Sequence, residues 1–274
     1  MNYNQWLTSS TALLKKSGIE SARLDCILLL SDQIDKSREW ILAHGDSEIA
    51  ESDQLILSTK VTQRSQRVPL AYIRNTQEFY GRSFYVDTNV LIPRPESEDI
   101  ISLLKSATKD PGSTTVIDIG TGSGILAITA KLEIPSLTVI ATDISESALQ
   151  VAKRNAQTYG ANIEFINSNL LETIPASSFQ LPTSILITNL PYVPTNLITS
   201  PEITYEPEGA LFSGDDGMSH YQRFWLQLAE AEPKPQSVIT ESLKEQHVAM
   251  QDYALQAGYI LKNTATLVQQ FVLS

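Results

Sequence analysis

The chain has 274 residues, of which 42% are hydrophobic, and it carries a formal net charge of −11 at pH 7. This length suits one large domain with a smaller companion, and no apolar run approaches the ~20 residues that span a bilayer. Nucleic-acid-binding proteins usually cluster Lys and Arg against phosphates, whereas this acidic chain has no basic run. The composition therefore disfavours a membrane protein and favours a protein or small-molecule partner over DNA or RNA.

Several features indicate a protein of the reducing cytoplasm, which we expect to be a monomer. Residues 1–6 lack the basic stretch and apolar core of a signal peptide. Cys26 is the single cysteine, so no disulfide can form within the chain, and its Leu/Ile-rich surroundings favour a buried apolar role. The histidines are too far apart for metal-ligand spacing, so solvated or helix-end roles and no metal site are expected for His44, His220 and His247.

Residues 1–75 are predicted to form a small helical domain. Four segments carry apolar residues at helical spacing and end at residues that favour helix termini. These segments run from about Leu7 to Gly18, from Ala22 to about Asp32, from Ser37 to His44, and from about Ser52 to Pro69. The polar faces of such a bundle are suited to docking, so this domain is the candidate for recognising the substrate.

Residues 76–95 are predicted to be a β-hairpin connector. Between residues 77 and 92, β-forming side chains are interrupted by Gly81-Arg82 and by Asp87-Thr88-Asn89, which favour turns. We expect this hairpin to link the helical domain to the rest of the chain.

Residues 96–274 are predicted to form a doubly wound α/β domain. Short apolar runs alternate with segments of helical spacing such as Ser145–Tyr159, which implies right-handed crossovers and a parallel sheet. The predicted strands are Thr115–Ile119, Leu137–Thr142, Asn162–Ile166, Thr183–Thr188 and Gln236–Thr240. Such sheets bind ligands beyond the carboxyl ends of their strands, so the residues that follow each strand are the candidate site residues.

The segment Gly120-Thr121-Gly122-Ser123-Gly124 follows the first of these strands and precedes an apolar helix. Glycine permits positive φ and lets a ligand approach the backbone, although dinucleotide-binding proteins share such loops. The spacing here differs from the pyrophosphate fingerprint, and Asp118 places a carboxylate near the helix N-terminus, where a phosphate would otherwise bind. The combination favours a cationic ligand such as S-adenosylmethionine, which carries a sulfonium and an ammonium group.

Further polar residues follow the later strands. The carboxylate of Asp143 can accept hydrogen bonds from both hydroxyls of a ribose. Proteins that bind NAD and proteins that bind S-adenosylmethionine both use a carboxylate in this way. Asp143 could instead cap the next helix, but Ser145 is available for that role, which favours ligand binding. Asn169 can meet an adenine edge or serve as a turn residue before Leu170, and Glu241 can line the site or cap the following helix.

The tetrapeptide Asn189-Leu190-Pro191-Tyr192 follows the fourth predicted strand. A planar nitrogen is a poor nucleophile, and a site can align it by accepting hydrogen bonds from both of its N–H groups. The side-chain oxygen of Asn189 and the backbone carbonyl of Leu190 are two such acceptors, and such alignment can lower a barrier by up to ~7–11 kcal/mol. Pro191 shapes the turn, and Tyr192 can stack on the substrate plane. Together with the glycine loop, this indicates methyl transfer from S-adenosylmethionine to an amide or amine nitrogen.

In these motifs and in several other segments, the chain resembles the release-factor glutamine N5-methyltransferases, the PrmC/HemK family of class I methyltransferases. The resemblance covers nearly the whole chain, and its most family-specific part is Pro93–Glu98. The other matching segments are Arg23–Asp25, Pro69–Ile73, Phe79–Gly81, Leu91–Ile92, Asp118–Gly124, Asn189–Tyr192, Tyr205–Pro207 and Ala210–Leu211.

The resemblance implies methylation of the glutamine side-chain amide in the Gly-Gly-Gln loop of a peptide-chain release factor, with S-adenosyl-L-methionine as the methyl donor. The cofactor-binding residues that we expect are Asp118, Gly120, Thr121, Gly122, Ser123, Gly124, Asp143, Asn169, Leu170 and Asn189. The catalytic and substrate-binding residues that we expect are Asn189, Leu190, Pro191 and Tyr192. Arg94 and Glu96 are candidates for substrate contact or for a structural ion pair.

The chain departs from the family pattern in several places. Leu190 replaces the usual proline, Asn169 the usual aspartate, and Pro233–Gln236 the usual Gly-Gly. The final Asp-x-x-Gly-x-x-Arg run is missing, which predicts a shortened last hairpin. Asn-Leu-Pro-Tyr is common in adenine dimethyltransferases of ribosomal RNA, so an adenine-N6 methyltransferase acting on RNA or DNA is an alternative, which steeply salt-dependent RNA binding would favour. A non-catalytic binding module, which would not bind S-adenosylmethionine, is another.

Overall fold

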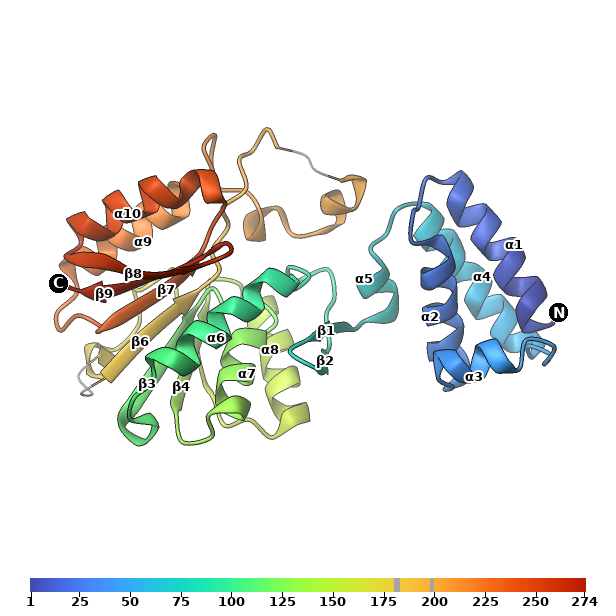
Figure 1. The fold of residues 1–274 in the computed structure, drawn as a ribbon, viewed down its shortest axis with the longest axis horizontal. Helices are drawn as coiled ribbons and strands as arrows, with labels where there is room; N and C mark the ends of the chain where they lie inside the picture. The colour runs from blue at the N-terminus through green and yellow to red at the C-terminus, as the bar shows by residue number, and fades with distance from the viewer. Residues whose placement is uncertain (180–182, 198–199) are drawn as a thin grey trace. The chain divides into compact units, whose positions relative to one another are not determined.

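The computed structural model describes residues 1–179, 183–197 and 200–274 (Figure 1). The chain divides into two compact units. The helical unit comprises Met1–Thr76 and Ser200–Tyr205, and the sheet unit comprises Gln77–Thr199 and Glu206–Ser274. A short segment from the second half of the chain therefore belongs to the helical unit.

The helical unit is built from helices packed around a core of leucines. Its helices are α1 (Tyr3–Lys16), α2 (Ala22–Ile34), α3 (Arg38–Ala43), α4 (Glu51–Ser65) and α5 (Leu70–Arg74). Leu14 from α1, Leu29 and Leu30 from α2, and Leu57 from α4 are fully buried in this core. Apolar residues at helical spacing thus predicted α1 to α4, because one face of each is buried, whereas α5 was not predicted.

Two details of the helical unit bear on the sequence predictions. Helix α4 ends at Ser65, and Pro69, expected to terminate it, instead precedes the separate helix α5. Proline is tolerated where a helix begins, because the first N–H groups have no partner within the helix. Cys26 is buried as expected, and burial raises the pKa of its thiol to about 11.

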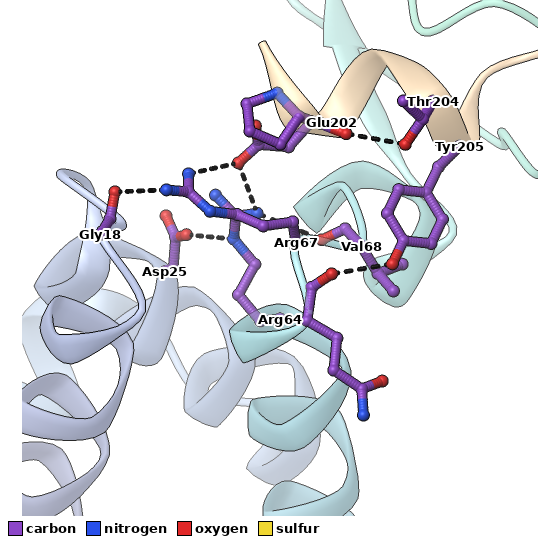
Figure 2. A network of polar contacts seen from close by, with 10 residues as sticks. Gly18, Asp25, Arg64, Arg67, Val68, Glu202, Thr204 and Tyr205 are labelled. Carbon is purple, nitrogen blue, oxygen red and sulfur yellow. Dashed lines mark hydrogen bonds and ion pairs between the residues drawn. The ribbon is translucent and has the colours of Figure 1, made fainter.

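Ion pairs join Ser200–Tyr205 to the rest of the helical unit (Figure 2). Arg64, from α4, donates to Asp25 at 2.7 Å and to Glu202 at 3.2 Å. Arg67 donates to the same oxygen of Glu202 at 3.1 Å. The glutamate is thus shared by two guanidinium groups, one of which also neutralises the buried Asp25.

A short antiparallel hairpin opens the sheet unit; its strands are β1 (Gln77–Phe79) and β2 (Arg82–Phe84). It is shorter than the predicted span of residues 77–92, because residues 85–92, all of them described, form no strand. The side chain of Asn155 accepts from the N–H of Tyr85 and donates to its carbonyl. These backbone groups are therefore satisfied by a side chain and do not extend the ladder.

The centre of the sheet unit is a mixed sheet with the strand order β5-β4-β3-β6-β7-β9-β8. The first five strands in this order are parallel, and β9 is antiparallel to both β7 and β8. The strands are β3 (Thr114–Ile119), β4 (Thr138–Asp143), β5 (Glu164–Asn167), β6 (Thr183–Thr188), β7 (Ser237–Glu241), β8 (Tyr259–Ala265) and β9 (Val268–Leu273). The predicted α/β fold is confirmed. Each of the five predicted strands matches an observed strand, and their first and last residues differ by at most two positions.

The last two strands form a hairpin. A shortened hairpin had been expected, because the Asp-x-x-Gly-x-x-Arg run is missing. Strands β8 and β9 contain seven and six residues and pair from Tyr259 with Leu273 to Ala265 with Val268. Because β9 also pairs with β7, the hairpin covers the edge of the parallel strands.

Helices cover both faces of the sheet (Figure 1). They are α6 (Glu98–Ala107), α7 (Ile125–Glu133), α8 (Glu146–Tyr159), α9 (Ser219–Glu230) and α10 (His247–Gln256). Val116 and Ile185 pack in the core with α6, α7 and α8, while their neighbours Ile117 and Leu186 pack in the core with α9 and α10. This burial on both faces explains why the strands are continuous apolar runs.

Short 3-10 helices occupy several connections. They are Pro95–Ser97, Pro111–Ser113, Ala176–Phe179, Pro201–Tyr205, Glu208–Ala210 and Lys244–Gln246. Across the part of the chain that the structure describes, no helix has the length and apolar character needed to cross a bilayer.

Candidate active site

A cavity of about 430 Å³ lies beyond the carboxyl ends of the parallel strands in the sheet unit. The segments that follow β3, β4, β5 and β6 line it: Gly120–Ser123, Asp143–Ser145, Ser168–Leu170 and Asn189–Pro191. Its other walls come from Asn89–Leu91, Pro93, Arg94, Ser97, Ile125, Leu126, Ala148, Pro207, Gly209, Ala210, His220 and Arg223. This is the position at which doubly wound sheets bind ligands.

The glycine-rich loop after β3 contributes backbone to the cavity. Gly120 and Gly122 have φ values of 72° and 55°, which residues with a Cβ rarely adopt. A Cβ at Gly120 would lie 3.0 Å from the side chain of Leu190, whereas a Cβ at Gly122 would meet nothing within 4 Å. Gly120 therefore allows the loop to pack against the tetrapeptide, and the space beside Gly122 is open to a ligand.

Asp118 and Gly124 lie outside the cavity wall and hold the loop in shape. The Oδ2 atom of Asp118 accepts from the hydroxyl of Thr121 at 2.6 Å and from the N–H of Ala127 at 3.2 Å. Asp118 is fully buried, and burial raises the pKa of its carboxyl to about 7. A Cβ at Gly124 would lie 2.9 Å from the Cβ of Ala152 in α8. Direct cofactor contact by Asp118 or Gly124 stays a prediction.

Asp143, the last residue of β4, lines the cavity and binds the glycine loop. Its Oδ2 accepts from the N–H of Gly122 at 2.9 Å, and its Oδ1 accepts from the N–H of Ser145 at 2.9 Å. Ser145 caps α8, because its hydroxyl accepts from the N–H of Ala148 at 3.2 Å. The cap is therefore Ser145, and burial raises the pKa of the Asp143 carboxyl at the cavity wall.

Asn169 and Leu170 line the cavity after β5. The side-chain amide of Asn169 donates to Glu172 at 3.1 Å, and Arg223 from α9 forms an ion pair with the same carboxylate at 2.8 Å. With its nitrogen used in this way, the Asn169 amide keeps its oxygen for another donor. Leu170 has a positive φ of 56°, so the chain turns sharply at this point.

His220 and Arg223 belong to the cavity wall, although neither was predicted as a site residue from the sequence. His220 lies at the start of α9, in the helix-end position expected for it, and the Ser213 hydroxyl lies 2.7 Å from its Nδ1. Burial lowers the pKa of this imidazole. Among the residues that the structure describes, no group of three or more His, Cys, Asp or Glu could hold a metal ion.

The tetrapeptide after β6 is anchored through its backbone. Asn189, Leu190 and Pro191 line the cavity, whereas Tyr192 lies outside its wall. The N–H of Leu190 donates to the hydroxyl of Tyr221 at 3.2 Å. The side chain of Gln246 donates to the carbonyl of Tyr192 at 2.8 Å. Leu190 is thus tied to α9, and Tyr192 to the 3-10 helix Lys244–Gln246.

The side chains of the tetrapeptide are also held. The amide nitrogen of Asn189 donates to the hydroxyl of Ser97 at 3.0 Å. The hydroxyl of Tyr192 donates to Oε1 of Glu241 at 2.8 Å, and burial and this carboxyl raise the pKa of Tyr192. Glu241 had been expected to line the site or cap a helix. It does neither, because it lies outside the cavity wall and α10 has Gln246 at its N-cap position.

Arg94 and Glu96, predicted as substrate contacts or an ion pair, have different positions. Arg94 lines the cavity and donates to Oε1 of Glu206 at 2.5 Å. The other oxygen of Glu206 accepts from the N–H of Ile92 at 3.0 Å, so the buried glutamate fixes the connector beside the cavity. Glu96 is exposed and lies outside the cavity wall, so only Arg94 is brought together with the tetrapeptide.

Ser97 and Tyr221 hold the tetrapeptide but were not singled out from the sequence. Ser97 lies inside the family-specific segment Pro93–Glu98, so its position was a usable signal. Tyr221 lies in an amphipathic helix, where a buried tyrosine looks like any other core residue. No pattern in the sequence distinguishes it.

The sheet order and the cavity at the strand ends are those of a doubly wound ligand-binding domain, and a family model identifies it as a methyltransferase domain. A family model described as "Methyltransferase small domain" matches residues 99–201, and one described as "PrmC N-terminal domain" matches residues 5–74. The fold is similar to the crystal structure of the hMettl16 catalytic domain in complex with MAT2A 3'UTR hairpin 6, with a TM-score of 0.54 and 11% identity over 82% of each chain. At this identity the likeness concerns the fold alone.

Curated relatives identify the family. The release factor glutamine methyltransferase of Enterococcus faecalis is 37% identical over 81% of this chain and 78% of its own length. That of Bacillus subtilis is 34% identical over 90% of this chain and 87% of its own length. The chain belongs to the release factor glutamine methyltransferase family, which confirms the resemblance seen in its motifs.

Proposed function

We propose that this protein transfers a methyl group from S-adenosyl-L-methionine to the side-chain amide nitrogen of the glutamine in the Gly-Gly-Gln loop of peptide-chain release factors. The observation that carries this proposal is that Gly120–Ser123 and Asn189–Pro191 line one cavity. The first segment suits a methyl donor, and the second suits a planar amide. The names of the relatives support the choice of release factors.

The cavity residues fit S-adenosyl-L-methionine. The backbone at Gly122 has open space beside it, and Asp143 offers carboxylate oxygens that can accept from ribose hydroxyls. Ile144 and Leu170 supply apolar surface for an adenine ring, and Asn169 supplies a polar edge. When bound, the cofactor supplies an electrophilic methyl carbon on a positively charged sulfur.

Asn189 and Leu190 would hold the substrate amide. Since the nitrogen of the Asn189 side chain is engaged by Ser97, its oxygen remains to accept one substrate N–H. The carbonyl of Leu190 would accept the other N–H, which fixes the plane of the amide and directs the nitrogen at the methyl carbon. Such a pair of acceptors helps an amide nitrogen because the nitrogen is otherwise poorly nucleophilic.

We further propose how the parts of the chain divide the task. Residues 1–75 would recognise the release factor, residues 76–95 would position it, and residues 96–274 would bind the cofactor and catalyse transfer. The net charge of −11 supports a protein substrate rather than a nucleic acid. The single cysteine fits action in the cytoplasm, and we propose that the protein acts as a monomer.

Transfer of a radiolabelled methyl group from S-adenosyl-L-methionine tests the proposal. The assay offers purified release factors, the same factors with Gln→Ala in the Gly-Gly-Gln loop, and ribosomal RNA. We expect label in the intact release factor only. Label in RNA, or equal label in the loop variant, would contradict the proposed substrate.

A further inference from the structure

Glu241 is a buried acid beside the tetrapeptide to which the proposed reaction gives no role. It ends β7, which pairs with β6 so that Thr240 lies opposite Thr188. The next residues along these two strands are Glu241 and Asn189, so the strand pairing brings the carboxyl to the residue that would bind the substrate. Glu241 is 0% exposed.

The carboxyl group is only partly satisfied. Tyr192 donates to Oε1 at 2.8 Å, whereas Oε2 has no hydrogen-bond partner among the residues that the structure describes. Burial raises the pKa of Glu241, and polar contacts with Ser97, Tyr192 and Asn189 lower it, while the carboxylate of Glu96 raises it. A buried oxygen without a partner is costly, so its retention calls for an explanation.

The chemistry of the neighbours supplies that explanation. An ionised carboxylate only accepts hydrogen bonds, so a polar contact between Glu241 and Ser97 suits a hydroxyl hydrogen directed at the carboxylate. The oxygen of Ser97 is then left to accept, and it accepts from the amide nitrogen of Asn189 at 3.0 Å. The amide oxygen of Asn189 is thereby the end left for a ligand in the cavity that Asn189 lines.

The orientation matters because a carboxamide has an acceptor at one end and a donor at the other. A substrate NH2 group presents donors only, so a reversed Asn189 would oppose a donor with a donor. Reversal is prevented if the group behind Asn189 is an acceptor, as Ser97 is when it accepts from the Asn189 amide nitrogen.

We propose that Glu241 is a positioning residue that sets, through Ser97, which end of the Asn189 amide faces the cavity and that fixes Tyr192 through its hydroxyl. This inference rests on the proposed function, because it explains how Asn189 becomes an acceptor for the amide being methylated. It also accounts for a buried acid close to the site but outside the cavity wall.

The test compares Glu241→Gln with Glu245→Gln, which makes the same change at an exposed position four residues further on. A glutamine at 241 can donate to Ser97 and so permits Asn189 to reverse. We expect kcat for release-factor methylation to fall by about ten- to a hundredfold, since misplaced groups cost on this order. The KM for the release factor and the calorimetric affinity for S-adenosyl-L-methionine should stay within about threefold, and Glu245→Gln should match the wild type in all three.

Ser97→Ala provides a second, independent variant, because it breaks the same connection without changing a charge. If Glu241 acts through Ser97, the double variant should lose little more kcat than either single variant. An unchanged kcat in Glu241→Gln, or losses that multiply in the double variant, would overturn the inference. If Glu241→Gln does not fold, Ser97→Ala decides by the same kcat and KM criteria. Wild-type activity in the same assay tests the proposed function separately.

Discussion

The hydroxyl of Tyr221 accepts a hydrogen bond from the backbone N–H of Leu190 at 3.2 Å. The same hydroxyl donates to the carbonyl of Glu241 at 2.6 Å, so it bridges the tetrapeptide to the end of β7. Leu190 stands where related methyltransferases usually have proline, which carries no N–H. Leucine at this position therefore supplies an N–H through which the tetrapeptide is anchored to Tyr221.

Tyr221→Phe should lower the free energy of unfolding by about 1–3 kcal/mol, because it leaves the buried N–H of Leu190 without a partner. Urea denaturation of the full chain measures this. An unchanged free energy of unfolding in Tyr221→Phe would show that this hydroxyl does not anchor Leu190.

Asn189→Ala should reduce kcat at least about a hundredfold, because the substrate amide loses its side-chain acceptor and its alignment. The exposed Asn162→Ala is the matched control and should leave turnover unchanged. Circular dichroism should show that both variants keep the fold. Undiminished turnover of Asn189→Ala would refute its assignment as the acceptor.

Gly122→Ala and Gly124→Ala should separate ligand binding from folding. Both positions have positive φ, which costs a residue with a Cβ about 1–2 kcal/mol. At Gly124 the added carbon would also lie 2.9 Å from Ala152, whereas at Gly122 it enters open space. Thermal unfolding should therefore show the larger loss for Gly124→Ala. Calorimetry should show that Gly122→Ala loses more cofactor affinity than Gly124→Ala, relative to the stability that each variant loses. If Gly124→Ala loses more affinity on this measure, the assignment of Gly122 to the cavity is contradicted.

Arg64→Gln should destabilise the protein by about 3–5 kcal/mol, because it leaves the buried carboxylate of Asp25 uncompensated. The comparison is Arg74→Gln, whose ion pair with Asp32 is more exposed. The side chains of Arg74 and Asp32 are 17% and 32% exposed, whereas those of Arg64 and Asp25 are 9% and 4% exposed. That pair should contribute only about 0–1 kcal/mol. Chemical denaturation measures both, and equal losses would argue against a special role for the buried network.

Asp118 should make stability decrease as pH rises. Its pKa is raised from 3.8 to about 7 by burial in the folded protein, so between these values the unfolded chain ionises while the folded chain stays protonated. Unfolding is therefore favoured progressively from about pH 4 to pH 7. Asp118→Asn removes this pH-dependent contribution to stability. In denaturant titrations, the stability of the variant relative to the wild type should therefore increase from about pH 4 to pH 7. A constant difference between the two proteins would show that Asp118 is not neutral when folded.

Much of the sheet unit could be predicted because its signals are local. Strands buried on both faces appear as apolar runs, and the residues that follow them necessarily meet at one edge of the sheet. The cavity accordingly contains Gly120, Asp143, Asn169 and Asn189, which were all selected from the sequence.

The remaining features depend on distant partners that no local pattern reveals. The hairpin ends after Phe84 because Asn155, far along the chain, takes the next backbone groups. The segment Ser200–Tyr205 joins the helical unit through Glu202, which is 138 residues from Arg64. The contact between Glu241 and Tyr192 likewise arises only when β7 and the end of β6 lie side by side.

Tandem mass spectrometry of a release factor after incubation with this protein and S-adenosyl-L-methionine locates any methyl group that is transferred. We expect one added methyl group on the side-chain amide of the glutamine in the Gly-Gly-Gln loop, and none when Asn189→Ala replaces the wild type. A methyl group on any other residue, or an unmodified release factor beside methylated RNA, would contradict this expectation.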